Sequence, residues 1–323
     1  MKKKKILGCS FPVFIFITIL LLGLFFFGFI SGPVGSNFFS GIKLPAWTHV
    51  AQPNPVLPAE RVFFNSPFLT NSIISAWLTI ILIVTLVFFA ARKAKLIPGK
   101  LQNFIEFIFE ALYNFCASVA GDNARAFFPV VSTIFLMVIF NAWIALLPIF
   151  GTIMVPGYEY QGGTWEHTMV PLFRSANTDI NLPLALAIVS FVSVTYFGIR
   201  ARKTEYVEQF FNFRPFFQST KKAVKREKGG IMGVFVGLIN IVVGLLELLG
   251  QFTRIISFTF RLFGNMIAGE ILILLFSFLL PYLVPLPFYG LELLVGFVQA
   301  LIFGGLTLVF MSVAVTSHES DHD

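Results

Sequence analysis

Residues 231–280 read IMGVFVGLINIVVGLLELLGQFTRIISFTFRLFGNMIAGEILILLFSFLL, an almost unbroken apolar run. As a helix rising about 1.5 Å per residue it would extend roughly 75 Å, over twice a hydrocarbon core of about 30 Å. The run contains no proline and no polar loop at which a helix would break. We therefore predict a single long, steeply tilted helix. The alternative is a split into two helices near Gln251.

The rest of the chain is similarly apolar. Of the 323 residues, 57% are hydrophobic and only 12% are charged, a balance that a water-soluble protein of this size would not need. Because hydrocarbon offers the backbone no hydrogen bonds, membrane-spanning segments form helices or closed barrels. The long apolar runs lack the alternation of barrel strands. The predicted fold class is therefore an all-α integral membrane protein.

Six apolar segments are long enough to cross a membrane, and the last two would form a long, tilted helical hairpin. They cover about residues 11–30, 70–91, 128–150, 182–199, 231–280 and 286–316. With the amino terminus inside, the inner side receives Lys2–Lys5, the basic residues of 92–100 and the basic run 200–228. This asymmetry follows the positive-inside rule and places both termini inside. Topology therefore explains the net charge of +7 better than nucleic-acid binding does.

Two further segments have open interpretations. The first apolar run is either a retained anchor or a cleaved signal peptide, because the small residues of GPVGS, 32–36, follow it. Its length favours the retained anchor. Residues 101–119 place apolar side chains at helical spacing with polar ones opposite, which predicts an amphipathic helix that ends at Gly121. This helix would lie on the inner membrane surface or offer a docking face to a partner.

The sequence contains no pattern of a bond-making site. Cys9 and Cys116 lie in different contexts and do not indicate a disulfide framework. We find no Gly-rich phosphate loop, metal-ligand spacing or nucleophile motif. The His-containing tail, residues 317–323, is too short and acidic to indicate a metal site. We therefore expect no cofactor and no catalytic chemistry in this chain.

Ionisable residues nevertheless occur inside the last two apolar segments. They are Glu247, Arg254, Arg261, Glu270 and Glu292. Each charge costs at least about 2.5–3.5 kcal/mol at the bilayer centre, so each needs a partner, water or a function. Glu247, Arg254 and Arg261 are spaced seven residues apart and share one stripe of the helix. Asn265, one turn later, stays close to this stripe.

Helix geometry separates Arg261 from Glu270. The two are nine residues apart, a rotation of about 180°, so they point from opposite sides of one helix and cannot pair within it. Arg261 therefore needs an outside partner or a water path. For Glu247 and Arg254, a role in packing alone is the simpler interpretation. On the last helix, Glu292 and Gln299 are seven residues apart and share a face.

Arginine and glutamate suit opposite tasks in ion conduction. A guanidinium stays protonated even when poorly solvated, whereas a lysine could lose its proton and become a step in a proton leak. Partial desolvation raises the pKa of a carboxyl group, which can then load and release a proton near working pH. A fixed cation between carboxylates would therefore block direct proton passage between them.

These residues fall in a recognisable pattern. RLFGNMIAGE at 261–270, with QALIF at 299–303, resembles the signature of subunit a of F-type ATP synthases, the membrane stator against which the c-ring turns. The resemblance extends through FNAWIALLPIFG at 140–151 and ANTDINLPLALAI at 176–188. It covers roughly residues 66–316. It implies an ion-conducting stator with two aqueous half-channels in an energy-transducing membrane, typically the bacterial plasma membrane.

The resemblance also implies roles for the residues at the contact with the ring. Arg261 would be the essential arginine that attracts a deprotonated c-ring carboxylate and separates the two half-channels. Gln299 would form a hydrogen bond near it, and Asn265 would line the same face. The last two helices would follow the curved surface of the ring.

Other residues would line the half-channels. Glu270 and Glu292 would belong to the outer one and Glu247 to the inner exit. Asp179 and Asn181 would extend the outer entrance, or alternatively cap the start of a helix. Where relatives often combine one acid with one histidine, this chain has two glutamates. The order of proton transfer and the choice between protons and sodium therefore stay open.

The resemblance divides the chain into three parts. Residues 1–65 form an amino-terminal anchor or signal with a Pro-rich outer stretch, 66–316 the membrane domain, and 317–323 a polar tail. Within the domain, the basic inner loop 200–230 would contact stalk subunits or anionic lipid. The implied partners are the c-ring, peripheral-stalk b-type subunits, membrane lipid and protons. ATP chemistry would occur on other subunits.

Two rival functions belong to other classes. A secondary transporter would carry a midplane site between repeated halves with broken helices, and the sequence shows neither feature. A structural membrane subunit would use its buried charges only to fix helix packing. In that case the loss of Arg261 would lower assembly but spare proton flux.

Overall fold

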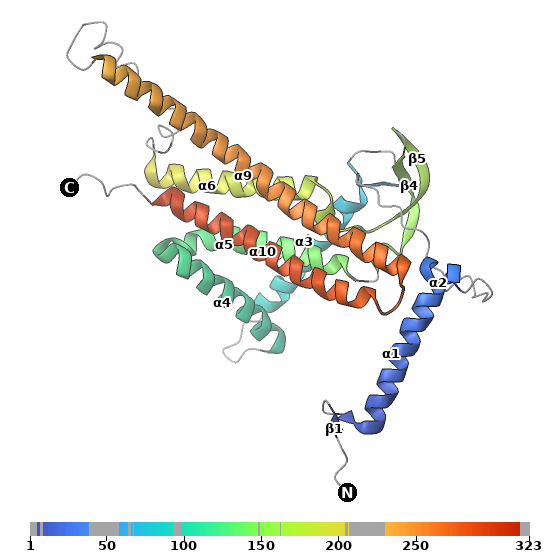
Figure 1. The fold of residues 1–323 in the computed structure, drawn as a ribbon. Coiled ribbons are helices and arrows are strands. Elements are labelled where there is room, and N and C mark those ends of the chain that lie inside the picture. Colours follow the sequence, from blue (N-terminus) through green and yellow to red (C-terminus); the bar gives the residue numbers. More distant parts are fainter. Residues whose placement is uncertain are drawn as a thin grey trace. The chain divides into compact units, whose positions relative to one another are not determined.

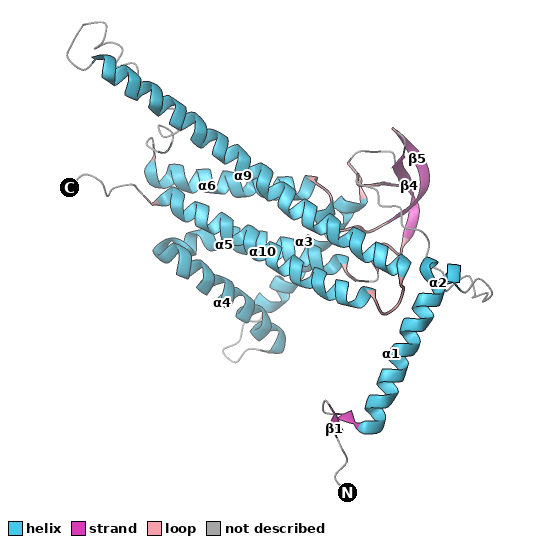
Figure 2. Cartoon of the chain, in the orientation of Figure 1, coloured by secondary structure: helices cyan, strands magenta, loops and turns pink. Residues whose placement is uncertain are grey.

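The computed structural model describes residues 5–6, 9–38, 58–63, 66, 68–92, 99–147, 149–161, 163–203, 206 and 230–316. Helices dominate these residues (Figures 1 and 2). They are α1 (Phe11–Ser31), α2 (Pro33–Phe38), α3 (Asn71–Ala91), α4 (Lys100–Ala120), α5 (Ala124–Ala145), α6 (Asn181–Arg202), α9 (Gly230–Leu279) and α10 (Pro285–Val315). The basic loop between α6 and α9, the tail and most of the Pro-rich stretch lie outside the described residues, apart from short pieces.

Six helical segments are apolar and long enough to cross a membrane by length and composition. They are Pro12–Ser31, Asn71–Ala91, Lys100–Ala145, Asn181–Arg202, Ile241–Leu279 and Pro285–Val315. This confirms the predicted all-α membrane fold with six segments. The third segment joins α4 to α5 through the short 3-10 helix Gly121–Asn123. Helix α9 is unbroken over 50 residues, so the prediction of one long helix is confirmed, and no split occurs near Gln251.

The boundaries of two elements test the sequence analysis further. The predicted amphipathic helix corresponds to α4, and it ends at Gly121, whose φ of 52° lies in the left-handed region that glycine adopts without strain. The third apolar run was expected at 128–150, but α5 runs from Ala124 to Ala145. The apolar residues after Ala145 are therefore not helical, and hydropathy alone extended the predicted helix too far.

A three-stranded antiparallel sheet was not predicted. Strand β3 (Arg61–Val62) pairs with β4 (Met154–Gln161), which pairs with β5 (Thr164–Pro171). In the register, Arg61 lies opposite Tyr158, and the guanidinium of Arg61 lies 3.9 Å from the centre of the Trp165 ring. A second, minimal pair is formed by β1 (Lys5–Ile6) and β2 (Cys9–Ser10). The larger sheet ties residues before α3 to the segment between α5 and α6.

The chain divides into two compact units. Unit 1 comprises Met1–Ile74, Ala142–Thr178 and Gly264–Phe297. Unit 2 comprises Ser75–Asn141, Asp179–Phe263 and Val298–Asp323. Helices α9 and α10 each contribute residues to both units.

The core of unit 2 is formed by α4, α5, α6 and α10, which lie side by side in Figure 1. Phe127, Leu308 and Met311 are fully buried there. Inside this apolar core, the hydroxyl groups of Ser190 and Thr307 lie 2.7 Å apart and satisfy each other. Such a pair joins α6 to α10 and removes the cost of placing two hydroxyl groups in an apolar environment.

In unit 1, α1 packs against the turn between α9 and α10 through small residues. A side chain at Gly28 would overlap the carbonyl of Pro281, and one at Gly32 would overlap the carbonyl of Leu279. The rings of Phe27 and Tyr282 lie 5.5 Å apart at the same contact. Glycines four residues apart let helices approach closely in a membrane, where packing drives their association.

This contact yields the first prediction. Gly32→Leu should separate α1 from the end of α9 and destabilise the protein by about 1–3 kcal/mol, because the added side chain meets backbone that cannot move aside. Gly23→Leu is the control, since Gly23 lies on α1, the helix that ends just before Gly32, with nothing within 4 Å of an added side chain. Thermal unfolding in detergent measures both. Equal melting temperatures for the two variants would contradict the packing described here.

Candidate functional site

Arg261 lies on α9 in unit 2 and is half-buried. Its Nη2 donates a hydrogen bond to the hydroxyl of Ser257 at 3.3 Å, one turn earlier, and its guanidinium lies 5.9 Å from the centre of the Phe258 ring. Over the described ranges, no carboxylate forms an ion pair with this guanidinium. The contacts of Arg261 within the described residues are thus weak ones.

Helices α9 and α10 contact each other at the level of Arg261. The rings of Phe258 and Phe303 lie 4.9 Å apart, and Phe303 is one turn beyond Gln299. Gln299 is buried, at 8% exposure, whereas Asn265 is exposed. No hydrogen bond joins Gln299 to Arg261 among the described residues. Aromatic packing, rather than a polar contact, therefore joins the two helices here.

Arg254, seven residues before Arg261 on α9, makes a different kind of contact. Its guanidinium lies 3.4 Å from the centre of the Phe310 ring on α10. A cation over an aromatic face gains electrostatic stabilisation that is largest where water is scarce. The packing role expected for Arg254 is therefore supported, with Phe310 as the contact. Glu247, two turns earlier on α9, is half-buried.

Asp179 and Asn181 form a local turn at the start of α6. The Oδ1 atom of Asp179 accepts hydrogen bonds from the backbone N–H of Asn181 at 3.2 Å and from its side-chain amide at 2.9 Å. An acidic side chain that binds the first N–H groups of a helix stabilises that end of the helix. This geometry supports the capping interpretation of the two residues.

A cavity of about 660 Å³ lies within unit 1, and charged side chains line part of its wall. They come from five different segments: Glu60 before β3, Glu159 on β4, Arg174 after β5, Glu270 on α9 and Glu292 on α10. Most of the remaining lining is apolar. Four carboxyl groups and one guanidinium thus share one cavity, and Glu270 and Glu292 are among them. The sequence analysis did not identify Glu60, Glu159 or Arg174 as site residues.

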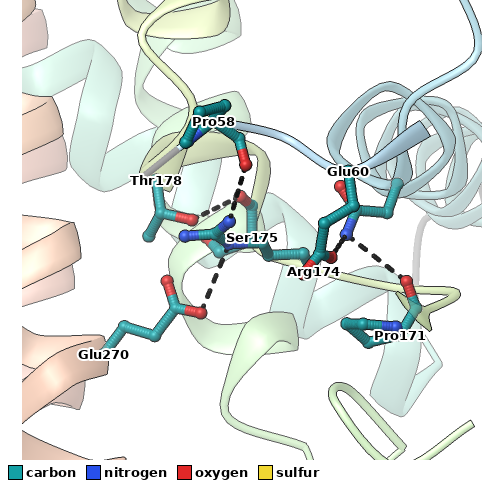
Figure 3. A network of polar contacts seen from close by, with 8 residues as sticks. Pro58, Glu60, Pro171, Arg174, Ser175, Thr178 and Glu270 are labelled. Atoms are coloured by element: carbon teal, nitrogen blue, oxygen red, sulfur yellow. Dashed lines mark hydrogen bonds and ion pairs between the residues drawn. The ribbon is translucent and has the colours of Figure 1, made fainter. Parts of the chain in front are cut away.

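Arg174 is the centre of a polar network at this cavity (Figure 3). Its Nε lies 3.4 Å from Oε1 of Glu270, an ion pair, and its Nη1 donates a hydrogen bond to the carbonyl of Pro58 at 3.3 Å. The side chain of Arg174 is only 10% exposed, so water screens this ion pair weakly. Arg174 therefore connects α9 to the chain segment that precedes β3.

Glu292 is buried on α10, at 8% exposure, and its carboxylate packs directly against Gly269 of α9. A Cβ atom at position 269 would overlap both carboxylate oxygens. The glycine that precedes Glu270 in the sequence therefore has a steric purpose. It makes room for a second carboxyl group beside the first.

Glu60, like Glu159, is a carboxyl group of the cavity that lies outside the membrane-spanning segments. Burial raises the pKa of Glu60 from its usual value of 4.5 to about 7. The positive charge of Arg174 and the hydrogen bond from Asn71 act in the opposite direction, whereas the charges of Glu159 and Glu270 raise the pKa further. Glu60 therefore exchanges its proton near neutral pH.

The signals for the missed residues were weak. Arg174 and Arg61 belong to no recognisable motif, and no periodic pattern marks the segment around Glu60. Tyr, Trp and Thr occur on both sides of the Gly-Gly pair at 162–163, a strand and turn signal that would have predicted the hairpin. Within the described part of the chain, no group of three or more metal-ligating side chains was found.

Comparisons with known proteins identify the family of this chain. Residues 73–312 match the protein family described as ATP synthase A chain. The chain belongs to this family. ATP synthase subunit a of Gloeobacter violaceus is 31% identical over 253 residues, which cover 78% of this chain and 86% of the relative. ATP synthase subunit a 3 of Pelobacter propionicus is 31% identical, over 73% of this chain and 83% of the relative.

Family membership and the six apolar helices together make this chain a multi-pass membrane protein of the ATP synthase. ATP synthase subunit a of Geotalea daltonii, 28% identical over 75% of this chain, is a further relative. The match begins at residue 73, so α1, β3 and Glu60 lie before it. These parts have to be understood from the structure of this chain alone.

The contact between Gly269 and Glu292 yields the second prediction. Gly269→Ala should displace the Glu292 carboxylate and lower proton flux through the assembled complex by about tenfold or more, because misplaced proton-transfer groups lose most of their effect. Gly290→Ala on α10 is the control, since a side chain there would meet nothing within 4 Å. Proton uptake by membrane vesicles measures both. Unchanged flux in Gly269→Ala would mean that the position of Glu292 is unimportant.

Proposed function

We propose that this chain is the ion-conducting stator subunit of an F-type ATP synthase. The observation that carries the proposal is Arg261, held on α9 without a carboxylate partner among the described residues. A cation in that state attracts an anion presented by another chain. A c-ring carboxylate that passes this surface in its deprotonated form is the partner with the required chemistry.

The cavity of unit 1 serves as the outer half-channel. It combines an apolar wall with Glu270 and Glu292, so water can enter and carboxyl groups can pass protons on. From there a proton reaches the ring carboxylate and neutralises it. The neutral carboxyl group can then move into lipid, which a charged one cannot do without a cost of several kcal/mol.

Arg261 prevents protons from crossing the membrane without rotation of the ring. After nearly a full turn, the ring carboxyl group releases its proton into an inner half-channel lined by Glu247 and returns to Arg261 as an anion. The guanidinium stays protonated and therefore carries no proton across, which prevents a shortcut between the half-channels. Each proton that follows the full route gains about 2.3 kcal/mol per 100 mV of membrane potential. ATP is formed on other subunits of the complex.

The surface of α9 beside Arg261 suits a moving partner. Phe260, the residue before Arg261, is exposed, and Gly264, three residues after it, has no neighbouring atom within 4 Å of an added side chain. Small and apolar side chains form a low surface without polar groups that would bind one ring position tightly. Asn265, also exposed, adds one polar group close to Arg261.

The remaining parts of the proposal concern topology and partners. Both termini and the basic loop 200–230 lie on the inner side, where the loop contacts b-type stalk subunits or anionic lipid. Residues 66–316 form the membrane domain of the subunit, and residues 1–65 add a retained anchor. The close packing of Gly28 and Gly32 against the α9–α10 turn supports retention, because cleavage would remove this contact.

The third prediction tests the role of Arg261. Arg261→Ala should reduce ATP-driven proton pumping to background in vesicles whose complex is intact, because no fixed cation then separates the half-channels. Arg254→Ala is the matched control: it removes the same charge seven residues earlier, where Phe310 is the contact, and assembled complexes should still pump.

Quantitative immunodetection of the subunits must accompany the pumping assay. Normal pumping by Arg261→Ala would reject the ion-conducting proposal and leave the structural-subunit interpretation. Arg261→Lys adds a further comparison, since a lysine keeps a charge that it can lose. This variant should also fail to pump, despite its positive charge.

A further inference from the structure

Glu60 is a buried carboxyl group to which the family signature gives no role. Its side chain is 8% exposed, and it lines the same cavity as Glu270 and Glu292. It also precedes residues 73–312, the range of the family match. Any function of Glu60 must therefore be argued from its own contacts.

Asn71, the first residue of α3, holds Glu60 in place. The backbone N–H of Asn71 donates a hydrogen bond to the Glu60 carbonyl at 3.1 Å. Its side-chain amide donates to Oε2 of Glu60 and, at 3.3 Å, to the carbonyl of Pro171 (Figure 3). Asn71 is itself completely buried. The Glu60 carboxyl group is thus fixed at the cavity wall rather than free to rotate into solvent.

Arg174 connects Glu60 with Glu270. It donates a hydrogen bond to the carbonyl of Pro58, two residues before Glu60, and forms the ion pair with Oε1 of Glu270. Oε2 of Glu270 is buried and has no hydrogen-bond partner within the described ranges. A carboxylate oxygen in that state is a strong acceptor for cavity water or for a proton.

We propose that Glu60 is a further proton-carrying residue of the outer half-channel, which exchanges protons with Glu270 through cavity water while Arg174 acts as their shared counter-charge. The inference rests on the proposed function. In the exchange, the O–H bond of the Glu60 carboxylic acid breaks, the proton moves through water, and an O–H bond forms on Glu270. Glu60 becomes the carboxylate stabilised by Arg174, and a proton from the outer aqueous phase restores its acid form.

The electrostatic surroundings of Glu60 fit this task. The charged groups that face it are Arg174, Glu159 and Glu270, together with the amide of Asn71, and burial outweighs them in setting its pKa at about 7. A proton-transfer group works best when its pKa lies near the working pH. A structural role would require no titration, because a glutamine oxygen can accept the Asn71 hydrogen bond equally well.

The fourth prediction uses this difference. The complete complex, reconstituted into liposomes with its ATP-forming sector outside, is driven by a fixed potassium diffusion potential while the internal pH is varied. Glu60→Gln should slow ATP synthesis severalfold at an internal pH of about 7 and above, where protons are scarce. The loss should stay below the roughly 100-fold typical of a missing general acid, since water can bypass Glu60. Below about pH 6 the rates should converge, because direct proton supply to Glu270 then suffices.

Glu166→Gln is the matched control. It removes the same charge from an exposed position on β5 that does not line the cavity, so its rates should follow those of the parent complex at every pH. Glu60→Asp keeps a titratable group and should retain most of the parent activity at high pH. If Glu60→Gln also follows the parent throughout, the proposed relay role is wrong.

Arg261→Ala in the same series separates this inference from the proposed function. Normal synthesis by Arg261→Ala would overturn the stator proposal, whereas an inactive Arg261→Ala beside an unaffected Glu60→Gln would overturn only the role of Glu60. If Glu60→Gln assembles poorly, carbodiimide labelling of the unmodified complex tests instead whether Glu60 carries a proton. Mass spectrometry should find an adduct on Glu60 whose yield falls as the pH rises past about 7. Absence of an adduct at every pH would reject the inference.

Discussion

The need to keep a positive charge stable in an apolar environment shapes this molecule. Three arginines meet it in three ways. Arg174 forms an ion pair with Glu270, and the guanidinium of Arg254 lies over the ring of Phe310. Arg261 has a hydrogen bond to the hydroxyl of Ser257 and a more distant contact with the ring of Phe258. Of these three, Arg261 has the weakest contacts within the described part of the chain. The packing of α9 and α10 through Phe258 and Phe303 keeps it at a defined position.

The carboxyl groups follow a complementary arrangement. Glu60, Glu270 and Glu292 belong to three separate segments, and each depends on a small or polar neighbour for its place: Asn71 for Glu60, Arg174 for Glu270 and Gly269 for Glu292. The three-stranded sheet brings the first of these segments to the cavity through the pairing of β3 with β4. Short strands outside the apolar segments thus help to line a cavity that the apolar helices also line.

The sequence was sufficient for what depends on local or periodic information. The unbroken apolar run predicted α9 as one helix because no proline or polar loop interrupts it, and Gly121 marked the end of α4 because only glycine adopts its φ readily. The pattern around Arg261 and Glu270 identified both residues, although only family resemblance could assign their roles.

The remainder depends on contacts between distant segments. The bond from Arg174 to Pro58 joins residues 116 positions apart, and β3 is two residues long, so neither produces a periodic signal. The early end of α5 has a local cause that hydropathy does not measure: Pro148 follows, and the residues before a proline avoid helical geometry. Long-range pairing and buried networks of this kind require coordinates.

The continuity of α9 has a consequence for how such a chain can evolve. In an unbroken helix, every residue inserted or deleted between Arg261 and Glu270 turns one of them by about 100° relative to the other and shifts it by about 1.5 Å. Substitutions along this interval change single side chains, but a change in its length would redirect everything beyond it. We therefore expect related proteins to differ in the residue types between positions 261 and 270, while the number of residues in this interval stays constant.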